Sequence, residues 1–320
     1  MIKVVKLVRN KLEKGDLEDL NSITGKTIWV DCVKPSDADI REIALKTGIS
    51  ERILKNALDE QERPRVQELK PYALIVYKAP FFKEDKAFTS SMATLISDEV
   101  LITLENEDLK SLERLNQLDE EDKKVSLEKG TSYFLCRILN EINTTYFNYM
   151  AEMEETIGSL EDEVFKKPDK KLVKKIFDLK KVLIYFHKAL VANREVLLSI
   201  ETAYIKQVKN KDVVEFNLHN DTLQLIEVGT VYTDLLTGAL DVYLSSISNN
   251  LNEVMKKLTV IATFILMPTL IAGIYGMNFA NTSPYNMPEL YWKYGYFFSL
   301  GLMLFSIIVF WIYFKRKGWM

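Results

Sequence analysis

An uncharged, apolar run near the C-terminus limits what this chain can fold into more than any other feature. Leu258 to Asn278 reads LTVIATFILMPTLIAGIYGMN and contains no Asp, Glu, Lys or Arg. As a helix rising about 1.5 Å per residue, it is as long as the hydrocarbon core of a bilayer is thick. A second uncharged run extends from Tyr294 to Phe314. The sequence therefore predicts two membrane spans joined by a short loop.

The charged residues lie almost entirely before these spans, and their balance excludes some functions. The 320 residues carry a formal net charge of -3, and no long basic block indicates nucleic-acid binding. The N-terminal residues lack the apolar core and cleavage site of a signal peptide, so we expect the N-terminus to stay in the cytoplasm. Cys32 and Cys136 are far apart and have no neighbouring Cys or His at metal-ligand spacing, which predicts buried, reduced thiols.

Residues 1–108 predict an α/β cytoplasmic domain, because short β-rich runs alternate with helical ones. The strand candidates are Ile2–Val8, Thr27–Val33, Tyr72–Phe82, Ser91–Ile96 and Val100–Leu104. Helical periodicity is present in Ser36–Lys46, with Ser36 as a candidate cap, and in Glu51–Asp59. This part of the sequence has no phosphate loop, glycine fingerprint or nucleophile elbow.

Residues 109–211 predict a cytoplasmic helical region that contains a hairpin of opposite charges. Helical patterns cover Glu107–Lys124 and Gly130–Glu163, and the second ends in a run of Glu and Asp. After a turn at 166–169, a lysine-rich helix returns. The two arms either pair their charges along their length and attract divalent cations, or each is a solvated face, since exposed ion pairs contribute only about 0–1 kcal/mol each.

One helix is predicted from Asp212 through Gly276, with residues 212–257 as a stalk and 258–276 as the first span. At about 1.5 Å per residue it would be roughly 95 Å long. A single globular domain has no need of such a length, so we expect an oligomer with a helical stalk that continues into the membrane.

A row of small or polar residues follows this helix when it is read back from Gly276 in alternating steps of three and four. An ordinary coiled coil has Leu, Ile or Val at these positions. We call this row the polar stripe; it consists of Asn217, Asn220, Gln224, Glu227, Val231, Asp234, Gly238, Asp241, Ser245, Ser248, Asn252, Met255, Thr259, Ala262, Leu266, Thr269, Gly273 and Gly276. Apolar residues flank it, including Leu225, Val228, Tyr232, Leu235, Leu236, Ala239, Val242, Tyr243, Ile247, Leu251 and Val254.

Two interpretations of the polar stripe are open for the stalk alone. It is either the wet face of an amphipathic helix or the lining of a central tube between several copies. Its continuation into the apolar run favours the tube, because there it selects Thr269 and Gly273, and polar groups at that depth face protein or water rather than lipid. The sequence therefore predicts a channel subunit whose copies pack through the flanking apolar residues.

Within this tube the side chains suggest different tasks. Asp241 would form an acidic ring that concentrates cations, and the Asn252 amide can hydrogen-bond the waters of a hydrated ion. Met255 and Leu258 are the bulky apolar residues at the membrane entrance, where such a ring can gate by dewetting. The alternatives are a solvated charge at Asp241 and ordinary packing at Met255 and Leu258.

Several motifs in the last eighty residues, and one near the N-terminus, resemble the CorA family of divalent-cation transport proteins. The most specific is Tyr275-Gly276-Met277-Asn278, followed in the next loop by Met287-Pro288-Glu289-Leu290. The stalk and first span add 241–246, 252–256, 258–259, 261–263 and 271–275, and Trp29-Val30-Asp31 with Pro35-Ser36 resembles the family's N-terminal domain.

The resemblance implies a funnel-shaped homopentameric channel in the cell membrane, both termini cytoplasmic, that takes up Mg²⁺ and often accepts Co²⁺ or Ni²⁺. It implies an external loop at 277–293, a second span at 294–314 and a basic cytoplasmic tail at 315–320. The charges agree independently: Lys256 and Lys257 precede the first span, and Lys315, Arg316 and Lys317 follow the second. The partners expected are other copies of the chain, the lipid bilayer and divalent cations, with no nucleic acid and no organic cofactor.

The resemblance also assigns a selectivity filter to Gly276, Met277 and Asn278 at the outer mouth. Mg²⁺ gives up its water reluctantly, so neutral amide and carbonyl oxygens that bind the hydrated ion suit conduction better than a carboxylate cage. Gly276 would free the backbone to bend where the helix ends, although a Gly here is also typical of a plain C-cap. Glu289 would add negative charge to the external vestibule.

Family members carry regulatory Mg²⁺ sites between cytoplasmic domains that close the pore. The corresponding stalk position here is Asn217, beside Asp221, and the N-terminal partner would be Glu84 or Asp85. Asn217 departs from the acidic ligand expected at that position. Pro268, inside the first span, predicts a local kink.

Other functions remain open from the sequence. The nearest is transport of zinc, cobalt or nickel by a member of the same superfamily; the polar stripe has no His or Cys, which argues against a dehydrated Zn²⁺ site. A membrane receptor with a signalling stalk is a second alternative. An enzyme is the least supported, because His187 and His219 lack evident partners in the sequence.

Overall fold

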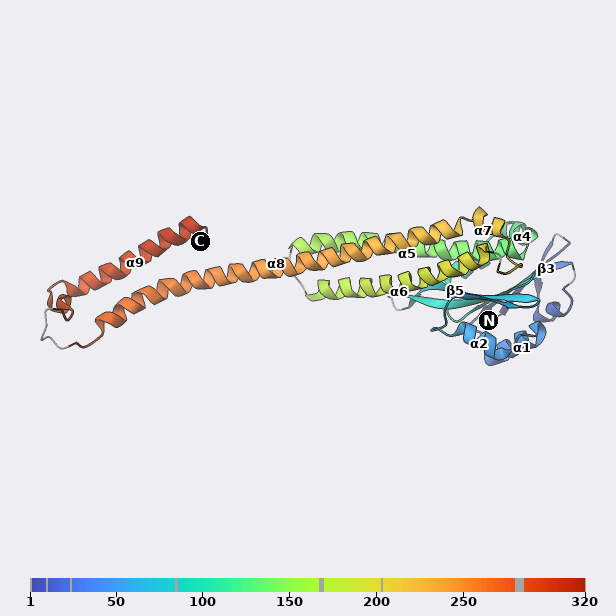
Figure 1. The fold of residues 1–320 in the computed structure, drawn as a ribbon, viewed down its shortest axis with the longest axis horizontal. Helices are drawn as coiled ribbons and strands as arrows, with labels where there is room; N and C mark the ends of the chain where they lie inside the picture. Colours follow the sequence, from blue (N-terminus) through green and yellow to red (C-terminus); the bar gives the residue numbers. More distant parts are fainter. Residues whose placement is uncertain are drawn as a thin grey trace. The chain divides into compact units, whose positions relative to one another are not determined.

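The computed structural model describes residues 2–9, 11–23, 25–83, 86–166, 170–202, 204–279 and 285–319. These residues divide into two compact units, Met1–Leu240 and Asp241–Met320. The first contains a β-sheet and most of the helices, and the second contains the two apolar segments (Figure 1).

A seven-stranded sheet in the order β2-β1-β3-β7-β6-β5-β4 forms the centre of the first unit. Strands β3 and β7 are parallel, and every other neighbouring pair is antiparallel. The strands are β1 (Ile2–Val8), β2 (Lys11–Gly15), β3 (Lys26–Val33), β4 (Arg65–Leu69), β5 (Tyr72–Lys83), β6 (Lys86–Ile96) and β7 (Val100–Glu105).

The five strand candidates are confirmed, and two strands were missed. β2 and β4 are the edges of the sheet, and their sequences KLEKG and RVQEL alternate poorly because solvent covers part of them. Charged residues on an edge strand prevent pairing with another chain, and they also remove the hydrophobic pattern by which a strand is recognised.

Helices cover both faces of the sheet (Figure 1). On one face lie α1 (Asp37–Thr47) and α2 (Glu51–Leu58), which pack on Ile28, Val30 and Cys32. The predicted cap is confirmed: Ser36 and Asp39 each accept a hydrogen bond from the other's backbone N–H. The alternate residues of β3 point to the other face, where the Trp29 ring meets Phe134 edge-on at 4.8 Å between centroids. Both cysteines are buried and free, as predicted.

The region after the sheet is helical. Its helices are α3 (Lys110–Gln117), α4 (Glu120–Glu128), α5 (Thr131–Lys166) and α6 (Lys170–Glu201). The single helix predicted for Glu107–Lys124 is wrong, because the chain breaks at Leu118, which has extended ψ. α5 and α6 form the predicted hairpin, although its turn at 167–169 lies outside the described residues.

The predicted continuous helix from Asp212 is also wrong at its start. The structure has a short helix α7 (Asn210–Glu215) and a separate helix α8 (Leu218–Tyr275) of 58 residues. Between them Asn217 has a φ of 53°, which a helix cannot accommodate. The Asn217 carbonyl accepts a hydrogen bond from the Asp221 N–H and so begins α8. Pro268 lies inside α8, and the kink predicted there stays a prediction.

The second unit consists of the end of α8, a 3₁₀ turn at Pro288–Tyr291 and helix α9 (Gly295–Lys317). Among the described residues, α8 and α9 are the helices long and apolar enough to cross a membrane. Phe264 and Phe314 join them edge-on, with centroids 6.0 Å apart. The predicted fold class, an α/β domain followed by long helices and two apolar spans, is confirmed, whereas the individual domain boundaries stay predictions.

Candidate ion pathway

The first half of α8 buries one continuous row of residues inside the first unit. These residues recur at alternating spacings of four and three, which is a heptad repeat. We call this row the apolar seam; it consists of Leu218, Thr222, Leu225, Gly229, Tyr232, Leu236 and Ala239. Tyr232 donates a hydrogen bond to Glu154 of α5 over 2.9 Å, and the Thr237 hydroxyl beside the seam accepts one from Lys180 of α6 over 2.7 Å.

This packing corrects one part of the sequence interpretation. Leu225, Tyr232, Leu236 and Ala239 were expected to hold neighbouring copies together, but they are buried within their own subunit. Other apolar residues beside the polar stripe remain exposed, among them Leu235 at 43 % and Leu251 at 60 %. Contacts between copies therefore have fewer apolar residues available than the sequence indicated.

The polar stripe is exposed along its whole length, from Asn217 to Gly276. Within the first unit it points away from the apolar seam, because its positions fall about half a turn from the seam in the same heptad. Asp241 and Asn252, the two polar residues singled out in the stalk, are both exposed. The surface that the sequence predicts as a pore lining is thus solvent-exposed in a single subunit.

At the entrance of the apolar segment, Met255 is 58 % exposed and Leu258 is 57 % exposed. The hydroxyl group of Thr269 donates to the Ile265 carbonyl over 2.7 Å, as does that of Thr259 to the Met255 carbonyl over 2.8 Å. Each hydroxyl hydrogen is thereby used by the helix itself, which leaves the oxygen lone pairs to accept hydrogen bonds from water. Thr269 and Gly273 share one shallow concave surface with Met277.

Helix α8 ends where the predicted filter begins. The Gly276 N–H still bonds to the Ala272 carbonyl over 2.9 Å, and the Met277 N–H bonds to the Ile274 carbonyl over 3.2 Å. Gly276 is not among the residues with positive φ, so it is not needed for a left-handed bend. A Cβ there would lie 3.2 Å from the Ala272 carbonyl oxygen, so its smallness permits close packing of the last turn. Met277 and Asn278 follow in irregular, exposed backbone.

Glu289 is held near the end of α8. Its carboxylate accepts a hydrogen bond from the Tyr275 hydroxyl over 3.3 Å. Its carbonyl oxygen lies where a Cβ on Gly295 would be, so only glycine fits at the first residue of α9. The loop thus places a carboxylate within one hydrogen bond of the residue that precedes the filter.

The predicted regulatory residues are only partly brought together. The Asn217 amide donates to the Asp221 carboxylate over 2.9 Å, so these two form a local pair at the start of α8. Glu84 and Asp85 lie outside the described residues. Across the described ranges, no three His, Cys, Asp or Glu residues gather as metal ligands. His219 does have a neighbour, since its Nδ1 lies 3.7 Å from a Glu201 carboxylate oxygen.

The structure also contains a buried acidic pair that the sequence did not indicate. Asp31 and Glu105 lie on the neighbouring parallel strands β3 and β7 and are 1 % and 2 % exposed. Asp31 accepts hydrogen bonds from the Thr103 hydroxyl over 3.0 Å and the Asn116 amide over 2.6 Å. Glu105 accepts one from the Leu109 N–H over 3.1 Å.

Burial governs the protonation of this pair. Burial raises the pKa of Glu105 to about 9, and the neighbouring Asp31 carboxylate raises it further. Burial also raises the pKa of Asp31, but the hydrogen bonds from Asn116 and Thr103 oppose that rise. Glu105 therefore holds a proton at neutral pH. The feature of the sequence from which this pair could have been found is the presence of two acidic residues in otherwise apolar strands.

Comparisons with known proteins agree with this architecture. A family model described as CorA-like Mg²⁺ transporter protein matches residues 24–316. The cobalt/magnesium transport protein CorA of Methanocaldococcus jannaschii is 36% identical over 315 residues, which cover 98% of this chain and 96% of that protein. The protein of the same name from Thermotoga maritima is 34% identical over 282 residues, covering 85% of this chain and 77% of that protein.

The solved structure of the complete CorA magnesium transporter from M. jannaschii superimposes with a TM-score of 0.89 at 34% identity. The superposition covers 100% of this chain and 99% of the M. jannaschii chain, so the likeness includes the first unit and both apolar helices. From the sheet to the last helix, this chain belongs to the CorA-like Mg²⁺ transporter family.

Proposed function

We propose that this chain is the subunit of a homopentameric channel that carries Mg²⁺ across the cell membrane, down its electrochemical gradient. The observation that supports this most is the polar stripe, which is exposed on one face of α8 and runs from the part of α8 in the first unit into the apolar segment. Relatives named as cobalt/magnesium and magnesium transport proteins support the cargo.

The chemistry of the stripe suits a hydrated divalent cation. Asp241 supplies charge before the membrane, and the Thr269 oxygen and Asn278 amide supply neutral acceptors within and beyond it. Such groups bind the water shell of Mg²⁺ without holding the ion too tightly to pass. Met255 and Leu258 would form the gate, and Gly276, Met277 and Asn278 the selectivity filter, with Glu289 in the external vestibule.

Flux into liposomes tests the filter. Purified wild-type protein, Asn278→Ala and a matched control, Asn250→Ala, are reconstituted at equal density, and Mg²⁺ entry is followed with an internal indicator dye. Asn250 is an exposed asparagine of α8 outside the polar stripe. We expect loss of flux or selectivity only for Asn278→Ala. Equal flux from all three would refute the assignment of Asn278.

Cargo and topology need separate tests. The same liposomes measured with Co²⁺, Ni²⁺ and Zn²⁺ would show which ion is preferred, and faster entry of Zn²⁺ than of Mg²⁺ would favour the zinc alternative. Both termini are proposed to be cytoplasmic, because Lys256, Lys257 and the basic residues after α9 flank the spans. Protease accessibility of terminal tags in sealed vesicles checks this orientation.

A receptor would differ from a channel in how the stripe is used. In a channel, cysteines introduced singly at Asp241 and at Thr269 would cross-link between subunits around the symmetry axis. In a receptor whose stripe faces bulk solvent, they would not.

Regulation by cytoplasmic Mg²⁺ is proposed from the family, with Glu84, Asp85, Asn217 and Asp221 as candidate ligands. Limited proteolysis with and without Mg²⁺ tests it, and identical digestion patterns would argue against a cation-locked closed state. No organic cofactor is proposed.

A further inference from the structure

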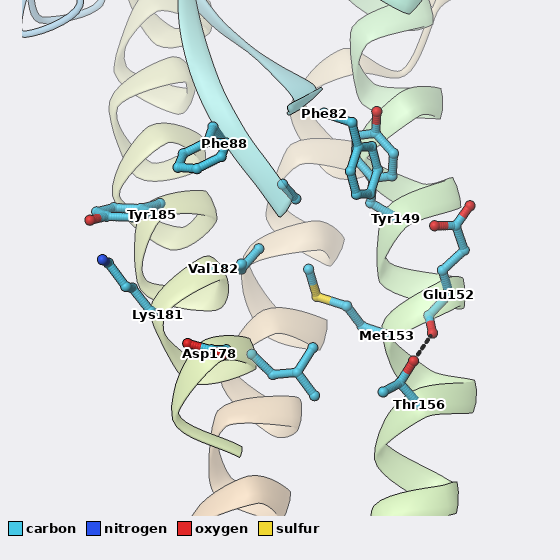
Figure 2. Close-up of a pocket in the computed structure, with 12 residues that line it drawn as sticks. Phe82, Phe88, Tyr149, Glu152, Met153, Thr156, Asp178, Lys181, Val182 and Tyr185 are labelled. Carbon is cyan, nitrogen blue, oxygen red and sulfur yellow. Dashed lines mark hydrogen bonds between the residues drawn. The ribbon is translucent and has the colours of Figure 1, made fainter. Parts of the chain in front are cut away.

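The first unit contains a cavity that the proposed ion pathway does not use. Its volume is about 330 Å³, at the lower end of the range of small-molecule sites. Three parts of the fold line it: the adjoining ends of β5 and β6, the middle of α5 and the first half of α6 (Figure 2). Because these parts come from distant segments of the chain, no sequence motif indicated the cavity.

The floor of this cavity is apolar. Figure 2 shows Met153 reaching from α5 toward Val182 of α6, with Phe88 from the start of β6 on the α6 side. Met153 is 7 % exposed. On the α5 side, the rings of Phe82 and Tyr149 meet edge-on with centroids 4.4 Å apart. A ligand that fills this space therefore needs an apolar middle part.

Two carboxylates lie at opposite rims of the cavity, Glu152 on α5 and Asp178 on α6 (Figure 2). Both are exposed, and within the described ranges neither takes part in an ion pair. Lys181 also lies at the rim, but its ammonium group already has a partner, the Tyr185 ring, 5.8 Å from the ring centroid. The charged residues that line the cavity thus carry a net negative charge.

The walls of the cavity also favour a positive charge. Tyr149 is 4 % exposed, and its hydroxyl has no hydrogen-bond partner in the part of the chain that the structure describes. Burial raises the pKa of this hydroxyl to about 12, and the Glu152 carboxylate raises it more than Arg114 lowers it. The Phe82 ring already attracts the Lys110 ammonium, 5.3 Å from its centroid. A cation is therefore the charge that this cavity attracts.

We propose that this cavity binds a linear organic cation that has an ammonium group at each end and methylene groups between them, which is the chemistry of a polyamine. One ammonium group pairs with Glu152 and the other with Asp178, while the methylene chain lies over Met153 and Val182. Aromatic rings at the margin attract the same ammonium groups. The apolar floor offers no ligands to a hydrated Mg²⁺ ion, so the organic cation fits this site better. The proposal goes beyond the proposed function and does not depend on it.

Equilibrium dialysis of the full-length protein in detergent tests the ligand class. Radiolabelled spermidine is the probe, at constant Mg²⁺ and constant ionic strength, and we expect saturable binding. Three competitors of equal chain length then differ only in their ends: 1,8-diaminooctane, octylamine and octanoate. The diamine should displace spermidine at the lowest concentration. Displacement at equal concentrations of diamine and octylamine, or better displacement by octanoate, would overturn the assignment.

Removing the two carboxylates tests their role. Glu152→Gln with Asp178→Asn should weaken spermidine binding about ten-fold, because each exposed charge pair is worth up to about five-fold. The matched control, Glu155→Gln with Asp162→Asn, removes the same charge from exposed positions of α5 outside the cavity and should bind like the wild type. Equal weakening in both variants would reduce the site to general charge attraction, and wild-type binding in both would refute the pairing.

Filling the cavity tests the apolar floor while every charge stays in place. Val182→Phe adds volume at a half-buried position of the lining, so it should weaken spermidine binding several-fold. Val191→Phe, also on α6 but outside the lining, is the control and should have no effect. Wild-type binding by a folded Val182→Phe protein would mean that spermidine is held at the surface and not in the cavity. Thermal unfolding of both variants checks that they are folded.

Discussion

Replacing Glu105 with glutamine should make the first unit more stable at neutral pH and change how its stability depends on pH. Glu105 is 2 % exposed, and burial raises its pKa from an ordinary value near 4.5 to about 9. Between these two values the folded chain binds a proton that the unfolded chain has released, so stability falls as pH rises. Glutamine removes this titration but keeps an oxygen that accepts the Leu109 N–H.

The magnitude follows from the width of that window. Each pH unit inside it lowers the free energy of unfolding by about 1.4 kcal/mol. From pH 5 to pH 7 the wild type should therefore lose about 3 kcal/mol relative to Glu105→Gln. The difference should level off above the folded pKa of about 9. Asp31 titrates in both proteins, so its contribution cancels in the comparison.

Urea unfolding of the full-length protein in detergent measures this difference. Trp29 is 1 % exposed and is the one tryptophan of the first unit, so replacing Trp292, Trp311 and Trp319 by phenylalanine isolates its fluorescence. In this background, the free energy of unfolding is compared with and without the Glu105→Gln substitution at pH 5, 6, 7 and 8. Parallel pH profiles would refute a protonated, buried Glu105.

Three smaller perturbations probe the rest of the structure. Leu225→Ala on the apolar seam should lower the free energy of unfolding by about 2–5 kcal/mol, as measured by urea unfolding. Leu235 lies on the same helix but is 43 % exposed, so Leu235→Ala should lower it far less in the same assay. Equal losses would mean that the seam is not buried. Tyr232→Phe should lower the free energy of unfolding by about 0.5–1.5 kcal/mol in the same assay, because it removes one hydrogen bond to α5. An unchanged free energy of unfolding would mean that this hydrogen bond does not stabilise the fold. Gly295→Ala should lower Mg²⁺ flux and the yield of folded protein, because a Cβ would overlap the Glu289 carbonyl; wild-type flux would show that the loop can shift.

Most of the fold could be predicted because its elements carry strong local patterns. The central strands, such as β5 with its ten successive buried residues, are apolar enough to be recognised without their neighbours. The edge strand β2 could not, since its role depends on pairing with β1 rather than on its own hydrophobicity. The break at Asn217 was missed because a single residue with positive φ leaves helical periodicity intact on both sides.

The candidate site was predicted less completely than the fold. The polar stripe is a property of one helix, so its spacing alone was sufficient to find it. Which flank of the stripe packs inside the subunit is decided by α5 and α6, far away in the sequence, and no pattern within α8 distinguishes Leu235 from Leu236. The Asp31–Glu105 pair similarly arises from the parallel alignment of β3 and β7, two strands separated by most of the sheet in sequence.

The unbroken length of α8 has a consequence for how this chain can change in length. The helix continues for 58 residues from the apolar seam into the apolar segment, so its two halves share one rotational phase. Inserting one residue between them would turn everything beyond by about 100°, moving the polar stripe off its face. Inserting seven would turn it by about two full revolutions and restore the face to within about 20°. We therefore expect this helix to tolerate insertions and deletions of seven residues better than a change of a single residue.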